Sequence, residues 1–447
     1  MGKIVSKFIC NECGYESMKW LGKCPACEAW NTLIEERGEK KTARMNKKRV
    51  ELVPLTSISS HDISRFSSGI GELDRVLGGG IVPGSIILLG GDPGIGKSTL
   101  LLQVADHIGT RGGKVIYLSG EESLKQIRLR SLRLDISNEN IYLLNEQEIE
   151  LLEEYIRDID PSLIIIDSIQ TVYSGGISSI PGSVAQLREC TARITEIAKK
   201  TEKAFFLIGH VTKEGAIAGP RVLEHMVDVV IYFEGENNFC FRLLRGIKNR
   251  FGSTNEIGLM EMRSEGLWEV LDPSEMLLGS GNAVGTAITS SFEGSRPFLI
   301  EAQALASPSG PGYPRRMAAG IDQNRLSLII AVLEKVQGYN LSVHDVYLRI
   351  TGGLFIKDPA ADLGIAAAII SSVRDTMLPA DTIFVGELGL SGQVRSAAFL
   401  EARLKEALKL GYKRAAVPAG VSSWTDKELK VYPLASLDNL IDFINKE

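Results

Sequence analysis

The chain has 447 residues, of which 44% are hydrophobic and 23% charged, so its composition is that of a globular protein and excludes a disordered or fibrous one. Its net charge of −5 gives no overall basic field that would indicate a nucleic-acid partner. No apolar run reaches the roughly 18 residues needed to cross a bilayer, and residues 1–7 contain no secretory apolar segment. We therefore expect a cytoplasmic protein with no membrane partner.

Four cysteines near the start of the chain form two Cys-x-x-Cys pairs, Cys10 with Cys13 and Cys24 with Cys27. Two such pairs facing each other supply four thiolates in a tetrahedron, which is the geometry of closed structural Zn²⁺ sites. Four thiolates leave no position for a catalytic water, so the ion would be structural. Chance pairing and a redox dithiol are the alternatives, and the regular spacing of the two pairs argues against them. We predict a zinc-binding domain over residues 1–35.

A basic stretch follows the cysteine pairs. Residues 37–49 hold seven Lys or Arg and one Glu. Such a stretch is either a solvated linker or an arm that contacts nucleic-acid phosphates, and composition does not separate the two. We assign residues 36–53 to a basic linker.

From about residue 54, apolar runs alternate with helical patterns, which indicates a parallel α/β sheet. One apolar strand runs into a G-x4-G-K-[ST] sequence and a helical pattern follows, which is the context that makes this phosphate-binding motif specific. The motif consists of Gly91, Asp92, Pro93, Gly94, Ile95, Gly96, Lys97, Ser98 and Thr99. We expect its backbone N–H groups to surround the phosphates of ATP, Lys97 to reach the β- and γ-phosphates, and Ser98 to bind Mg²⁺.

A second apolar strand ends in Asp167, which we expect to hold Mg²⁺ through its water shell. The next residue is Ser168, whereas AAA+ ATPases carry their catalytic Glu at that place. Here Glu121 and Glu122 follow another strand, an arrangement that resembles RecA-like and DnaB-like ATPases. We predict that Glu121 orients and deprotonates the attacking water, with Glu122 as the second choice. The alternative is that both are exposed acids at the end of a strand.

A further apolar strand ends in His210, which could sense the γ-phosphate or could be structural. The loops at 174–185 and 211–222 are longer than simple connections require. In RecA-like motors the equivalent loops line the DNA channel, so this assignment rests on the resemblance.

A short motif makes the resemblance specific. It consists of Lys248, Asn249, Arg250, Phe251 and Gly252. By itself it is typical of a solvated hairpin. Alongside the four-Cys pairs and the RecA-like core, it closely resembles the KNRFG motif of the RadA (Sms) family of bacterial DNA repair proteins. Residues 209–215 and 219–228 resemble that family too, and the resemblance covers essentially the whole chain.

The resemblance implies a homo-hexameric, DNA-dependent ATPase that works with the RecA recombinase on single-stranded and branched DNA. The implied activity is branch migration, in the manner of a DnaB-like helicase. Lys248 and Arg250 could act across a subunit interface on a neighbour's γ-phosphate, as arginine fingers do, or could bind a DNA phosphate. The sequence leaves both uses open.

After residue 272 the chain resembles the Lon protease domain over 356–368 and 384–394. That enzyme uses a Ser–Lys dyad, and in our alignment the Ser position falls on Ala360 and the Lys position near Leu400-Glu401. We therefore predict no proteolysis and expect residues 273–447 to hold the ring together and to offer basic surface to DNA. The candidate cations, each also explicable as an ordinary surface charge, are Arg315, Arg316, Arg325, Arg395 and Arg403.

The predicted fold class is α/β: a RecA-like P-loop ATPase core over 54–272, a small N-terminal four-Cys zinc ribbon, and a C-terminal α+β Lon-protease-like domain. The favoured function is a ring-shaped motor on single-stranded DNA that promotes branch migration in recombinational repair. The alternative is a RecA-fold regulatory ATPase that switches protein partners without DNA translocation. An active ATP-dependent protease is a third class, against which the missing Ser and Lys count.

Overall fold

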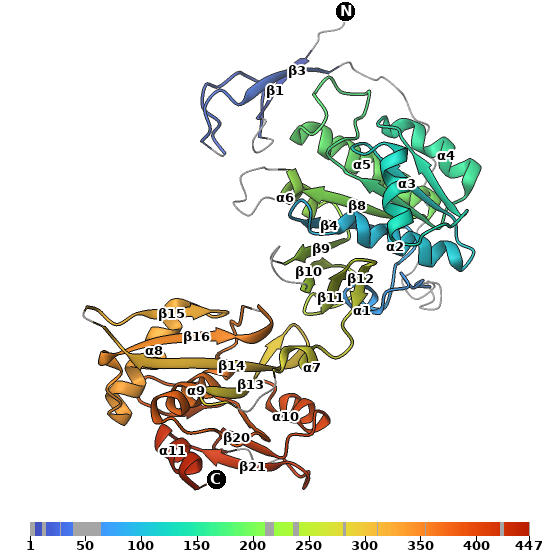
Figure 1. Ribbon diagram of the computed structural model, residues 1–447. Helices are drawn as coiled ribbons and strands as arrows, with labels where there is room; N and C mark the ends of the chain where they lie inside the picture. Colours follow the sequence, from blue (N-terminus) through green and yellow to red (C-terminus); the bar gives the residue numbers. More distant parts are fainter. Residues whose placement is uncertain are drawn as a thin grey trace, which may run out of the picture. The chain divides into compact units, whose positions relative to one another are not determined.

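The computed structural model describes residues 5–10, 15–26, 28–38, 64–210, 219–235, 241–279, 283–310, 312–353, 355–420 and 424–446. The chain divides into two compact units, Met1–Val270 and Leu271–Glu447 (Figure 1), and each is considered by itself. Within the described residues, no helix has the length and apolar character needed to span a membrane.

The N-terminal segment is a small antiparallel sheet of β1 (Val5–Cys10), β2 (Glu16–Ser17) and β3 (Leu33–Gly38), in the order β2-β1-β3. Among the described residues its buried core consists of Cys10, Cys24 and Leu33, with Phe8 and Leu21 packed against them. A segment of this size can bury little apolar surface, which is why small folds of this kind commonly depend on a bound metal.

The larger part of the first unit is a nine-stranded sheet in the order β12-β11-β10-β9-β4-β8-β7-β5-β6. Its strands from β9 to β6 run parallel, and β10, β11 and β12 extend it as antiparallel strands. The bounds are β4 (Ile86–Gly91), β5 (Val115–Ser119), β6 (Ile141–Leu144), β7 (Leu163–Asp167), β8 (Ala204–His210), β9 (Val229–Glu234), β10 (Phe241–Asn249), β11 (Ile257–Arg263) and β12 (Gly266–Glu269).

Helices cover both faces of this sheet, so its central strands are continuous apolar runs. In β4, Ile87 and Leu89 join the core formed with α1 and α2, whereas Ile86 and Leu88 join the core formed with α4 and α5. The helices are α1 (Gly71–Leu77), α2 (Lys97–Thr110), α3 (Leu124–Arg133), α4 (Leu152–Ile159), α5 (Val184–Thr201) and α6 (Gly219–Glu224), with a 3₁₀ turn, η3, at Ile149–Leu151.

The second unit contains a mixed seven-stranded sheet in the order β15-β16-β14-β13-β17-β20-β21 and a two-stranded sheet of β18 and β19 (Figure 1). The strands are β13 (Thr286–Glu293), β14 (Arg296–Pro308), β15 (Arg316–Ala319), β16 (His344–Ile350), β17 (Thr382–Phe384), β18 (Glu387–Leu388), β19 (Val394–Arg395), β20 (Arg414–Pro418) and β21 (Lys430–Leu434). The helices are α7 (Pro273–Leu277), α8 (Gln323–Gln337), α9 (Asp362–Arg374), α10 (Leu400–Lys409) and α11 (Leu437–Lys446), with 3₁₀ turns η4 (Leu341–Val343), η5 (Thr351–Gly353) and η6 (Pro359–Ala361). The predicted fold class is confirmed: along the chain, a small β ribbon is followed by an α/β core and then by an α+β unit.

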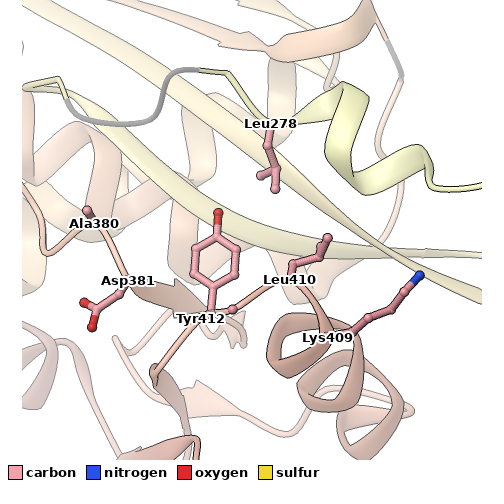
Figure 2. A pocket seen from close by; sticks show the side chains of 7 residues that line it. Leu278, Ala380, Asp381, Lys409, Leu410 and Tyr412 are labelled. Atoms are coloured by element: carbon pink, nitrogen blue, oxygen red, sulfur yellow. The ribbon is translucent and has the colours of Figure 1, made fainter.

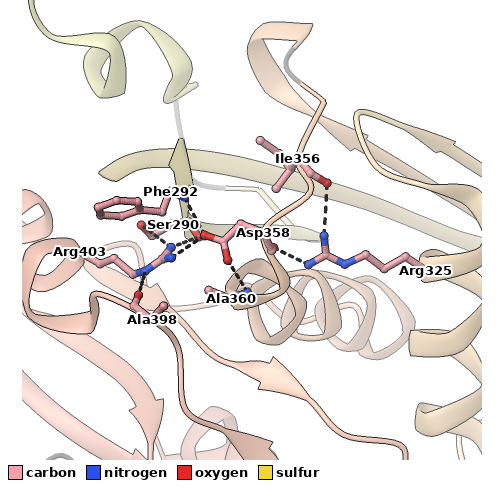
Figure 3. A network of polar contacts seen from close by, with 8 residues as sticks. All are labelled: Ser290, Phe292, Arg325, Ile356, Asp358, Ala360, Ala398 and Arg403. Atoms are coloured by element: carbon pink, nitrogen blue, oxygen red, sulfur yellow. Dashed lines mark hydrogen bonds and ion pairs between the residues drawn. The ribbon is translucent and has the colours of Figure 1, made fainter. Parts of the chain in front are cut away.

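A buried ion pair corrects one prediction about the second unit. Arg403 does not offer its charge to DNA, because its side chain is only 1% exposed and pairs with Asp358 at 2.5 Å (Figure 3). The guanidinium also donates to the backbone oxygens of Ala398 and Ser290, at 2.9 and 3.1 Å, and lies over the ring of Phe292. Its ion pair and hydrogen bonds are made inside the second unit, so Arg403 is a core residue.

Asp358 is held from several sides. Its carboxylate accepts from the backbone N–H groups of Phe292 and Ala360, at 2.7 and 3.0 Å. Its backbone oxygen accepts from Arg325, whose side chain also pairs with Asp362 at 2.6 Å and is 16% exposed. Burial raises the pKa of Asp362, and Arg325 opposes that rise. Arg325 is therefore also wrong as a DNA-contacting candidate.

Two further residues, Ala360 and Glu401, lie at the predicted protease positions, and the remaining candidate cations differ in their contacts. Ala360, at the predicted nucleophile position, is buried next to the ion pair. Glu401 is exposed and pairs with Lys405 at 2.6 Å. Among the cations predicted to face DNA, Arg315 and Arg395 are exposed, and Arg316 donates to the backbone oxygens of Leu341 and His344.

We expect Arg403→Ala to lower the free energy of unfolding of the second unit by about 3–5 kcal/mol, because Asp358 would keep a buried charge without its partner. Hydrogen exchange on the full chain, followed over residues 271–447, would measure it. Arg395→Ala is the matched control: its pair with Glu387 is at the surface, with 58% of the arginine side chain exposed. Arg395→Ala should lower the free energy of unfolding by less than about 1 kcal/mol. Equal effects of the two substitutions would contradict the role assigned to Arg403.

Candidate nucleotide site and metal centre

The predicted phosphate motif and carboxylates meet in one cavity of about 390 Å³, at the edge where β4, β5 and β7 end. Ligands of open parallel sheets bind outside the carboxyl ends of the strands, so the position is the expected one. The lining residues are Pro93, Gly94, Gly96, Lys97, Ser98, Thr99, Glu121, Glu122, Arg130, Arg133 and Asp167. The structure therefore brings together Lys97, Ser98, Glu121 and Asp167.

The motif forms a tight loop between β4 and α2. Gly96 immediately precedes α2 with a φ of 115°, a backbone conformation that residues with a Cβ rarely adopt, so the position favours glycine. The first turn of α2 then begins with Lys97, and its backbone N–H groups and dipole favour an anion at this end.

Lys97 is 4% exposed, and its ammonium donates to the backbone oxygens of Gly91 at 2.7 Å and Asp92 at 2.9 Å. Burial lowers the pKa of Lys97 to about 8, while the carboxylates of Asp167, Asp92 and Glu121 act in the opposite direction. The cavity is thus electrostatically prepared for a group that brings its own negative charge, such as a phosphate.

The Ser98 hydroxyl and the Asp167 carboxylate line the same cavity, and oxygen ligands of this kind are those that Mg²⁺ prefers. Asp167 is 6% exposed and accepts a hydrogen bond of 2.6 Å from the hydroxyl of Tyr117. These residues fit a magnesium–nucleotide complex. Sequence reasoning missed Tyr117, because a tyrosine inside an apolar strand looks like an ordinary core residue.

The two neighbouring glutamates have different surroundings. Glu122 is ion-paired with Arg130, with 32% and 21% of the two side chains exposed. Glu121 is more exposed and accepts a hydrogen bond of 2.5 Å from Ser168. Glu122 is thus engaged by the guanidinium of Arg130, and Glu121 by the hydroxyl of Ser168. Arg130 and Arg133 are cavity residues that sequence reasoning missed, although their i,i+3 spacing on the helix after Glu122 was a usable signal.

His210 is the last residue of β8, and its backbone lies opposite Gly91, the first residue of the phosphate motif. The following residues 211–218 lie outside the described part of the chain. The strand end is thus where the sequence places it, and the sensor role of His210 stays a prediction.

The KNRFG motif lies at the end of β10. Lys248 donates to the backbone oxygens of Glu224, His225 and Val227, at 2.9, 3.3 and 2.8 Å, where α6 ends. Burial, followed by the charge of Arg250, lowers the pKa of Lys248.

Arg250 is more exposed than Lys248, Asn249 and Phe251. Arg250 pairs with Asp228 at 3.0 Å yet leaves 54% of its side chain exposed. Asn249 accepts from the backbone N–H of Phe251 at 2.8 Å, so the turn toward Gly252 is fixed by a side chain. Lys248 therefore holds its own chain together, whereas Arg250 presents a cation to solvent.

The predicted zinc centre is described only in part, since Cys13 and Cys27 lie outside the described residues. Cys10 and Cys24 are both buried in the same small cluster. Their backbone N–H groups donate to the backbone oxygens of Tyr15 and Ala29, each at 2.9 Å. Two buried thiols in one cluster fit a soft structural metal.

Another cavity, of about 660 Å³, lies in the second unit (Figure 2). Its lining consists of Leu278, Ala380, Asp381, Lys409, Leu410, Gly411 and Tyr412. Its charged groups are already paired, Asp381 with Arg414 and Lys409 with Asp272. We therefore assign the chemistry to the smaller cavity at the phosphate motif.

A strand–loop–helix phosphate motif at the edge of a parallel sheet, joined to a cysteine ribbon and an α+β unit, defines a P-loop ATPase. Residues 54–216 match the model of the AAA domain, residues 8–35 the rubredoxin metal binding domain, and residues 329–420 the subunit ChlI of Mg-chelatase. These matches support a structural zinc ion, ATP and Mg²⁺ as cofactors and ATPase activity.

The chain is 52% identical to the DNA repair protein RadA of Bacillus subtilis (strain 168), covering 98% of both chains. It is 47% identical to the protein of that name from Brucella abortus (strain 2308), covering 99% of this chain and 98% of that one. For Synechocystis sp. (strain ATCC 27184 / PCC 6803 / Kazusa) the identity is 45%, over 98% and 94% of the two chains. The chain belongs to the RadA family, which confirms the resemblance seen in the sequence.

We expect nucleotide affinity to fall about tenfold between pH 7 and pH 9, because the free Lys97 ammonium, with a pKa of about 8, loses its proton over this range. Bound phosphates would stabilise the charged form, so binding takes up a proton above pH 8 and weakens as the pH rises. Titration with a fluorescent ATP analogue measures it. Lys97→Arg, whose guanidinium stays charged at pH 9, should lack this dependence. A nucleotide affinity that stays the same between pH 7 and pH 9 would contradict the assignment.

We expect about one zinc ion per chain in protein purified under reducing conditions, because four thiolates complete one tetrahedral site. Cys10→Ser should lose most of this metal, whereas Cys190→Ser, at a buried cysteine of α5, should keep it. Metal analysis by mass spectrometry measures the content. A zinc content that Cys10→Ser leaves unchanged would refute the ligand set.

Proposed function

We propose that the cavity binds ATP and Mg²⁺ and hydrolyses the γ-phosphate. The observation that carries this proposal is the convergence of Lys97, Ser98, Glu121 and Asp167 in one cavity at the sheet edge. Lys97 and the N-terminus of α2 would hold the β- and γ-phosphates, and Ser98 and Asp167 would hold the metal, which supplies charge neutralisation when bound. Glu121 would orient a water molecule and accept its proton as the water oxygen bonds to the γ-phosphorus, while the bond from that phosphorus to the β–γ bridging oxygen breaks and ADP leaves.

Membership of the RadA family, whose relatives carry the name DNA repair protein, supports a role in DNA repair, and we propose that hydrolysis depends on DNA. A motor of this kind would form a homo-hexameric ring on single-stranded DNA and, with RecA, promote branch migration of strand-exchange intermediates on branched DNA. Such work on bacterial DNA takes place in the cytoplasm, where we expect the chain to act.

The loop that follows β7 supports a DNA contact, because it leaves the sheet at the same edge as Asp167. Gln186 is 2% exposed and fixes the root of this loop: its amide accepts from the backbone N–H of Ser174 and donates to the backbone oxygens of Ser174 and Ser179. Glu150 accepts from the Ser174 hydroxyl as well. The tip presents Ile180, which is 72% exposed. The loop is thus held at its root and offers its tip to another molecule.

Of the two cations in the KNRFG motif, we propose that Arg250 reaches outward, because Lys248 is engaged by three carbonyls of its own chain. The exposed guanidinium would contact a neighbour's γ-phosphate or a DNA phosphate. Lys248 would support this position through the end of α6.

We also propose that the second unit has no protease activity. Its predicted nucleophile position is the buried Ala360, which has no hydroxyl, and the adjoining space is occupied by the ion pair of Asp358 with Arg403. The unit would instead serve ring assembly and DNA contact, with the exposed Arg315 and Arg395 as the remaining candidate cations.

We expect single-stranded DNA to raise the rate of ATP hydrolysis severalfold, and added salt to weaken this effect because DNA binding releases counterions. Steady-state phosphate release with and without DNA measures it. Lys97→Ala should lower the rate about 100-fold or more, since it removes a charge from the site of phosphoryl transfer. Hydrolysis that DNA leaves unchanged would argue against the motor and for the regulatory ATPase that switches protein partners.

A further inference from the structure

Two buried hydroxyl groups lie behind the cavity, and each contacts a carboxylate that comes from the neighbouring strand. Tyr117, on β5, donates to Asp167 at the end of β7 at 2.6 Å, and its side chain is 1% exposed. Ser168, which follows β7, donates to Glu121 after β5 at 2.5 Å, and it is 0% exposed. A hydroxyl group from each of the two adjacent strand segments therefore donates to a carboxylate of the other.

Local geometry fixes this exchange. The backbone N–H of Gly120 donates to the backbone oxygen of Asp167 at 3.0 Å, so the strands stay paired up to the two carboxylates. Beyond them, the hydroxyl and the N–H of Thr171 both donate to the backbone oxygen of Ser168, at 2.7 and 3.1 Å. A Cβ on Gly120 would lie 2.1 Å from the Thr171 hydroxyl, so the glycine lets this turn pack directly against β5.

We propose that Tyr117 and Ser168 are positioning residues for ATP hydrolysis: Tyr117 orients Asp167 toward the metal, and Ser168 orients Glu121 toward the attacking water. The proposal rests on the function proposed above, since it takes the roles of Asp167 and Glu121 from there. Residues that hydrogen-bond a metal-binding carboxylate fix its direction, and their loss costs about 10- to 100-fold in metal affinity.

The chemistry of the donors suits these tasks. The hydroxyl of Tyr117 is a phenol that keeps its proton at neutral pH, and it donates to Asp167 at 2.6 Å. A hydroxyl directs a carboxylate without neutralising it. An arginine in the same place, as Arg130 is for Glu122, would compete with a metal ion for the negative charge.

A purely structural role would produce similar contacts, because buried tyrosine and serine hydroxyls usually find an acceptor. The two roles differ in what the variants lose. A structural role predicts lower thermal stability with an unchanged reaction. A positioning role predicts a changed dependence on Mg²⁺ for Tyr117 and a changed kcat for Ser168.

Tyr117→Phe removes the one oxygen and keeps the ring. We expect the Mg²⁺ concentration that gives half-maximal hydrolysis to rise about tenfold or more, with most of the rate recovered at saturating Mg²⁺. Tyr232→Phe is the matched control, because it removes a 2.6 Å hydrogen bond to Glu224 outside the cavity lining. A Mg²⁺ dependence in Tyr117→Phe equal to that of the wild type or of the control would overturn this half of the proposal.

Ser168→Ala should lower kcat about 10- to 100-fold while nucleotide affinity stays unchanged, because Glu121 would lose its fixed direction but the phosphate loop would not. Ser68→Ala is the control, since Ser68 is equally buried and its hydroxyl bonds only locally to Ile70 among the described contacts. Should Ser168→Ala fail to fold, Ser168→Cys keeps the volume with a weak donor and should show the same loss. An unchanged kcat in the folded variant would overturn the second half.

Glu121→Gln and Asp167→Asn separate this proposal from the one on which it rests. If either variant hydrolyses ATP like the wild type, the assigned roles are wrong and the proposed function fails at that residue. If both lose activity while Tyr117→Phe and Ser168→Ala behave like the wild type, the proposed function stands and the positioning roles of the two hydroxyls are wrong.

Discussion

Complete burial of the central parallel strands is the constraint on which the nucleotide site depends. All residues of β4, β5 and β7 are buried, because helices cover both faces of the sheet. Charged side chains are therefore found at the ends of these strands, and Asp167 and Glu121 lie at the same edge of the sheet. The phosphate loop also begins at this edge, since β4 ends at Gly91. The chemistry is thus brought together by the requirement that the sheet interior be apolar.

The electrostatics of the loop follow from the same burial. Desolvation disfavours the Lys97 ammonium, and the nearby carbonyls and carboxylates only partly restore its stability. A phosphate in the cavity would bring a negative charge close to the Lys97 ammonium. The same low exposure that disfavours the charged lysine also strengthens its attraction to this phosphate. The Lys248 ammonium is engaged by three backbone oxygens, against two for Lys97.

The parts that could be predicted from the sequence are those whose signal is contiguous. The phosphate motif, the strand before it and the helix after it are adjacent in the chain, so their geometry follows from local rules. The choice between Glu121 and Glu122 depends on Arg130 and Ser168, which only the folded structure brings to them. The prediction for Arg403 was wrong because its charge was given more weight than its place in α10. There it shares the buried face with Leu404 and Ala407, a spacing that a helical pattern does reveal.

The second unit shows how a buried charge depends on its partners rather than on its residue type. Asp358 and Arg403 are tolerated in the interior because backbone N–H groups, backbone oxygens and an aromatic ring satisfy them on every side that the structure describes. The hydrogen bonds hold this ion pair in one arrangement and engage the polar atoms that a reaction would need. At the nucleotide site the donors to the carboxylates include the neutral hydroxyls of Tyr117 and Ser168. A neutral donor fixes the direction of a carboxylate without adding a positive charge, as the roles proposed for Asp167 and Glu121 require.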